Sequence, residues 1–151
     1  MKAIAKTAAV LVILGILIGV AYAQFAKPEK AVKYRKAVMT VIAQHFGRLG
    51  AVVKGKEAYD QKAFADNTAV IETLAGLPWE AFLVPGSDKG QTTMAASALE
   101  NPDKMNSLAR EFEAGVAKLS AAAQGGDLKA IKTQFGAVAK SCKSCHKQTR
   151  K

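Results

Sequence analysis

The segment DLKAIKTQFGAVAKSCKSCHKQTRK, residues 127–151, decides the fold. Apolar side chains and both cysteines recur in it at alternating spacings of three and four residues: Leu128, Ile131, Phe135, Val138, Cys142 and Cys145. This spacing places them on one side of an α-helix. Asp127 is suited to cap the first turn. The segment therefore predicts a helix whose core-facing seam includes both thiols.

The same helix carries Cys142-Lys143-Ser144-Cys145-His146, a C-x-x-C-H pattern. Such a pattern attaches a c-type haem through two thioether bonds, with the histidine as an axial ligand of the iron. On a helix, positions i and i+3 lie on one face, so the thiols and the imidazole can present a single edge to a flat ligand. We expect one covalent haem c attached through Cys142 and Cys145, with His146 as the proximal ligand.

Three other uses of these residues fit the sequence less well. Zinc needs four ligands, and His45 is the one candidate left after the motif. A thioredoxin-like redox pair opens a helix, where the dipole lowers a thiol pKa, whereas this pair lies near a helix end. A disulfide between positions i and i+3 of a helix would be strained. Haem attachment is favoured over all three.

Strand patterns are nearly absent, and three further segments show helical spacing. The first runs from Pro28 to about 53, and the second starts near Asp60 and stops at Pro78. The third runs from Asn101-Pro102, a capping pair, to about 125. The chain therefore predicts an all-α, antiparallel up-down-up-down four-helix bundle. Residues 78–101 read as a loop that folds back onto the bundle.

The N-terminus differs from the rest of the chain. Lys2 and Lys6 precede an uncharged apolar run, and Ala21-Tyr22-Ala23 has the form of a cleavage site. We expect residues 1–23 to be a cleaved signal peptide and residues 24–151 to be one exported, periplasmic domain. An uncleaved anchor is the less favoured alternative, since residues 7–26 are long enough to span a bilayer.

The charge is strongly basic. The 151 residues carry 22 Lys and Arg against 12 Asp and Glu, and removing Lys2 and Lys6 with the leader lowers the formal charge from +10 to +8. This balance favours an acidic redox partner protein. Nucleic acid is excluded as a partner, because the domain is expected outside the cytoplasm and its lysines are scattered.

Taken together, these features resemble the cytochrome c prime family, the class II c-type cytochromes, over the whole of residues 24–151. The resemblance is carried by the C-x-x-C-H motif and by the segments Ala31-Val32-Lys33-Tyr34-Arg35, Leu77-Pro78-Trp79-Glu80-Ala81-Phe82 and Phe135-Gly136-Ala137-Val138. It implies a four-helix bundle with covalent haem c, and a homodimer as a possible assembly.

The resemblance also implies roles for individual residues. Arg35 would lie beside the haem propionates, Met39 over the distal iron face, and Arg150 against the proximal face. Lys36 stands next to Arg35 where the family commonly has Gln. Leu99 and Met105 occupy positions where the family often has aromatic residues.

The sixth iron position separates the functions that we consider. If the sulfur of Met39 is the distal iron ligand, the haem is low-spin and suits one-electron transfer, which is our first hypothesis. If Met39 is core packing, the position is open to NO or CO, which is the alternative. His45 is a weak candidate for this position. We do not expect an enzyme, because the sequence offers no distal acid–base residue.

Overall fold

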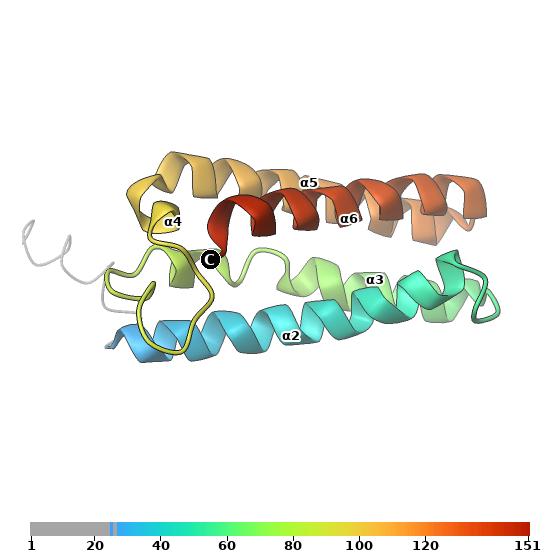
Figure 1. The fold of residues 1–151 in the computed structure, drawn as a ribbon. Helices are drawn as coiled ribbons and strands as arrows, with labels where there is room; N and C mark the ends of the chain where they lie inside the picture. Colours follow the sequence, from blue (N-terminus) through green and yellow to red (C-terminus); the bar gives the residue numbers. More distant parts are fainter. Residues whose placement is uncertain (1–24, 26) are drawn as a thin grey trace, which may run out of the picture.

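The computed structural model describes Phe25 and residues 27–151. Its four long helices are α2 (Pro28–Val53), α3 (Gln61–Leu74), α5 (Pro102–Gly125) and α6 (Leu128–Thr149). They form an antiparallel bundle in which α3 packs against both α2 and α5, and α5 packs against α6 (Figure 1). The predicted fold class is confirmed.

The predicted signal peptide and its cleavage site lie outside the described residues. Within the part of the chain that the structure describes, no helix combines the length and the apolarity that a membrane crossing requires.

Local chemistry sets most of the helix ends where the sequence predicts them. Pro28 occupies the first turn of α2, and the carboxylate of Asp127 accepts a hydrogen bond from Lys129 N at 2.8 Å. Gly126 ends α5 with φ 74°, a left-handed conformation that favours glycine. Asn101 departs from expectation. It holds the N-cap position of α5, but its side chain donates to Ser97 O at 3.1 Å instead of capping the helix.

The core follows the predicted apolar stripes. Its most deeply buried large side chains, each at most 1% exposed, include Leu49, Ile71, Val116, Leu119, Ile131 and Val138. Between α2 and α6, Phe46 stacks on Phe135 with ring centroids 4.3 Å apart and planes 6° from parallel. Gly50 makes room for this ring, because a Cβ there would lie 3.2 Å from Phe135 Cζ.

The chain between α3 and α5 closes one end of the bundle. Helix α3 ends at Leu74, before it reaches Pro78, and is followed by the 3-10 helix η1 (Trp79–Phe82) and the short helix α4 (Ser97–Glu100). Residues 83–96 between them, which we call the strap, pass from the first half of α2 to the carboxyl end of α6 (Figure 1). Met94 of the strap forms an antiparallel bridge with Arg150. The loop folds back as predicted, although the sequence did not indicate its two short helices.

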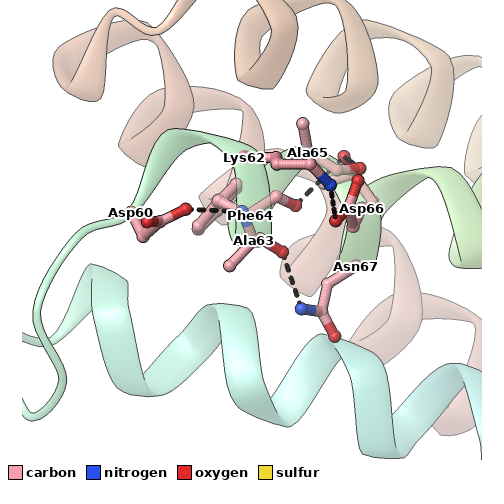
Figure 2. Close-up of polar contacts among 8 residues, drawn as sticks. Asp60, Lys62, Ala63, Phe64, Ala65, Asp66 and Asn67 are labelled. Carbon is pink, nitrogen blue, oxygen red and sulfur yellow. Dashed lines mark hydrogen bonds and ion pairs between the residues drawn. The ribbon is translucent and has the colours of Figure 1, made fainter.

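The start of α3 gives a direct test of helix capping. Asp60 accepts a hydrogen bond from Ala63 N at 2.7 Å, and one turn further on Lys62 pairs with Asp66 at 2.8 Å (Figure 2). We expect Asp60→Ala to lower the free energy of unfolding by about 1 kcal/mol, because an amide at the helix start loses its acceptor. Asp66→Ala is the matched control, and it should change little, because the ion pair is solvent-exposed. Urea unfolding followed by circular dichroism measures both, and equal losses would contradict the cap assignment.

Candidate haem site

The C-x-x-C-H motif occupies the last turns of α6. Cys142 and Cys145 are half-buried and His146 is exposed. The backbone amide of Arg150 donates to His146 O at 3.2 Å, at the C-cap that ends the helix just after the motif. The sequence therefore placed the motif correctly, on a helix whose seam turns both thiols toward the bundle.

His146 lies against a permanent positive charge. Its Nε2 is 3.0 Å from Arg150 Nη2, and since arginine can only donate, the imidazole nitrogen accepts this hydrogen bond. Desolvation, with a further contribution from the charge of Arg150, lowers the pKa of His146. The imidazole is therefore neutral at neutral pH, which is the form that binds a metal ion.

Two adjoining cavities lie beside the motif. The inner cavity, of about 360 Å³, is largely apolar and is lined by residues of α2, η1, α5 and α6, among them Phe46, Trp79, Leu108, Phe112 and Cys142. The outer cavity, of about 440 Å³, is bordered by the strap and by Arg35 and Lys36. Met39, Cys145, His146 and Arg150 line both. We call the two cavities together the slot.

Met39 and His146 come to the slot from opposite walls. Met39 is half-buried on α2, and His146 extends from α6. The structure thus brings together the two residues that the sequence predicted on the two iron faces. His45 does not join them: its Nδ1 lies 2.8 Å from Asn67 Oδ1 of α3, and the ring lines neither cavity of the slot.

The slot becomes basic toward its mouth. Arg35 is only 3% exposed, and burial lowers its pKa, an effect that the charge of Asp88 opposes. Arginine nevertheless stays protonated in proteins. Lys36 is exposed on the next position of α2. These two cations and Arg150 suit a ligand with an acidic edge.

The chemistry of the lining fits a haem. Two thiols and a neutral imidazole lie at one wall, apolar side chains fill the interior, and cations surround the mouth. Trp79 lines the inner cavity, and within the described residues its Nε1 is a buried nitrogen that lacks a hydrogen-bond partner. Buried donors are normally satisfied, so this atom is suited to a polar group of a bound ligand.

Several residues that line the slot could not be assigned to it from the sequence. The sequence pattern did not indicate that Trp79, Leu108 and Phe112 line the inner cavity. Leu99 and Met105, which occupy positions where the family often has aromatic residues, pack with Met94 and line neither cavity. Periodicity identifies the buried side of α5, but it does not tell which buried residues border a space.

A four-helix bundle whose last helix presents C-x-x-C-H to an apolar slot with a basic mouth is a c-type haem protein. Comparison with known sequences narrows this class. The sequence model of the family described as Cytochrome C' matches residues 30–150. The chain belongs to the cytochrome c' family, and its cofactor is haem c, for which Cys142 and Cys145 are the two cysteines present.

Individual relatives match over nearly their whole length. Cytochrome c' of Alcaligenes xylosoxydans xylosoxydans is 43% identical over 85% of this chain and 98% of its own. The crystal structure of cytochrome c' from Rubrivivax gelatinosus has a TM-score of 0.80 at 40% identity, over 85% of this chain and 100% of that one. Cytochrome c prime variants from Alcaligenes xylosoxidans, 42% identical with a TM-score of 0.79 over 85% of this chain, have been solved with nitric oxide and with carbon monoxide bound, covering 98% and 99% of those chains.

Burial of the thiols has a testable consequence for the polypeptide before haem attachment. Desolvation raises the pKa of both Cys142 and Cys145. The reactive thiolates therefore form at higher pH in the folded chain than in the unfolded chain, where the pKa is about 8.5. We expect alkylation by iodoacetamide, followed from about pH 7 to about pH 10, to reach its half-maximal rate at higher pH without urea than with it. Coincident profiles would show that the folded chain does not desolvate the thiols.

Proposed function

We propose that the protein binds nitric oxide or carbon monoxide at a single haem c attached through Cys142 and Cys145, with His146 as the proximal ligand. The lining of the inner cavity carries this proposal, because Met39 and the apolar side chains near it would border the face of the haem opposite His146, where a small apolar ligand would bind. The NO and CO complexes of relatives support it. Haem c itself would supply an iron that can take one further ligand besides the proximal histidine and can exchange one electron.

The side chains of the slot define what this iron would encounter. Met39 stands at the distal wall as a flexible thioether that limits the space for a ligand. Phe112 and Leu108 line the same space with apolar side chains, which disfavour water there. Among the described residues that line the inner cavity, none is Asp or Glu, and the Ser141 hydroxyl already donates to Val138 O at 2.9 Å. This lining favours reversible binding over chemistry that needs a proton donor.

The mouth of the slot would receive the acidic edge of the haem. Arg35 and Lys36 are the cations of α2 that border the outer cavity, and Arg150 borders it from α6. Their charges would neutralise carboxylates at this position. Arg150, which hydrogen-bonds to His146, would remain on the proximal side.

One-electron transfer is the second candidate function, and the charge around the mouth favours it. Lys36 and Arg150 are exposed there, and Lys151 donates to Asp88 O at 3.0 Å close by. A basic rim at the edge of a redox centre steers an acidic partner protein toward it.

Export through a signal peptide of residues 1–23 would place either activity in the periplasm.

Substitutions of Met39 separate the two candidates. If Met39 only limits space, the ferrous wild-type protein is high-spin and Met39→Leu keeps that spectrum, because leucine fills a similar volume. Met39→Ala should raise the affinity for CO by about tenfold or more, equivalent to about 1.4 kcal/mol. Met105→Leu is the control, because Met105 is buried but lines neither cavity of the slot. Absorption spectra and CO titration measure these effects.

The opposite pattern would favour the electron carrier. A low-spin ferrous spectrum in the wild-type protein that becomes high-spin in both Met39 variants would identify the thioether as an iron ligand. A purified holoprotein that takes up neither NO nor CO would contradict the proposed function.

A further inference from the structure

Within the described residues, the hydrogen bonds of Arg35 go to backbone and hydroxyl oxygens. Nη1 donates to Ala81 O and to Ser87 Oγ, both at 2.9 Å. Nη2 donates to Ser87 O at 2.6 Å and to Thr92 Oγ1 at 2.8 Å. The guanidinium also lies 5.0 Å from the centre of the Phe82 ring. A single buried cation of α2 is therefore bonded to η1 and to two places in the strap.

The far end of the strap is bonded to α6. Ala95 N donates to Thr149 O, and Lys151 N donates to Thr93 O, each at 2.8 Å. Thr92 connects the two sets of bonds, because its Oγ1 accepts from Met94 N at 3.1 Å as well as from Arg35. Figure 1 shows the strap running between the first half of α2 and the end of the chain.

We propose that Arg35 is a positioning residue for the haem site. Through Ser87 and Thr92 it anchors the strap, and the strap holds the last turn of α6 at a fixed place relative to α2. That turn carries His146, and α2 carries Met39. The proposal rests on the haem c site, and it gives Arg35 a task separate from charge neutralisation at the slot mouth.

The energetics favour a firm anchor. A buried cation is tolerated only when its N–H groups are bonded, and a hydrogen bond from a charged donor is stronger than one between neutral groups. Lifting the strap would break several of these bonds at once and leave the guanidinium buried without partners. All four acceptors belong to residues 81–92, so these hydrogen bonds do not require a bound haem.

Thr92→Val tests this role without altering Arg35. Valine keeps the shape of threonine and removes the oxygen that joins Arg35 to Met94. Thr92→Ser, which keeps the hydroxyl, should restore wild-type behaviour. Thr93→Val is the matched control, because the neighbouring Thr93 is exposed and takes part through its backbone oxygen.

Two measurements on the haem-loaded protein report the effect. Hydrogen exchange of the Ala95 amide, followed by NMR in the diamagnetic CO-bound ferrous form, should accelerate about tenfold or more in Thr92→Val, the factor expected for one charge-assisted hydrogen bond. The iron–histidine stretching band in resonance Raman spectra of the ferrous protein should shift or broaden in the same variant. Both should stay at wild-type values in Thr92→Ser and Thr93→Val.

Arg35→Gln separates anchoring from charge neutralisation. An anchor predicts that it accelerates exchange at Ala95 and alters the iron–histidine band as Thr92→Val does. A shift of the midpoint potential in Arg35→Gln, with exchange and Raman band unchanged in both Arg35→Gln and Thr92→Val, would overturn the proposal. Failure of the protein to bind NO or CO would instead reject the proposed function, and the anchor would then be tested by the Raman band of the ferrous protein, which needs no bound gas.

Discussion

The separation between α2 and α6 is the constraint on which the rest of the structure depends. At one place the flat faces of Phe46 and Phe135 hold these helices together, and Gly50 leaves the space for that contact. Toward the motif the connection is made by the strap, which is bonded to Arg35 on one side and to Thr149 on the other. Between the aromatic contact and the hydrogen-bonded strap, helices α2 and α6 stay apart and border a space large enough for a ligand.

This arrangement explains why the chemistry of the site changes along its length. Near the aromatic pair the lining is apolar, and the thiols there are desolvated. Near the strap it is cationic, with Arg35 satisfied by backbone and hydroxyl oxygens so that its charge is retained at low solvent exposure. A molecule with an apolar body and an acidic edge matches both ends, whereas a small ion or a fully polar ligand matches only one.

The helices and the motif could be predicted because their determinants are local. The seam of α6 repeats without interruption, and residues such as Asp60 and Gly126 mark helix ends through bonds to their own neighbours. The strap could not be predicted in the same way. Arg35 and Thr92 meet only in the folded chain, and neither lies in a pattern that indicates its partner. Asn101 shows the same limit. A local capping rule predicts that its side chain caps α5, but the side chain instead donates to Ser97 O in the preceding helix.

The aromatic pair also bears on the order in which the molecule is built. Phe46 and Phe135 are brought together from the first and the last of the four long helices, whereas α5 and α6 are joined by a short turn. Closing a long loop costs more chain entropy than closing a short one, and distant contacts form slowly. The helical hairpin that carries the thiols is therefore expected to form before the space that surrounds them. A group already bonded to that hairpin would enter the cavity as its walls close. Its contacts with the walls would exist only in the folded state, and would therefore stabilise that state relative to the unfolded chain.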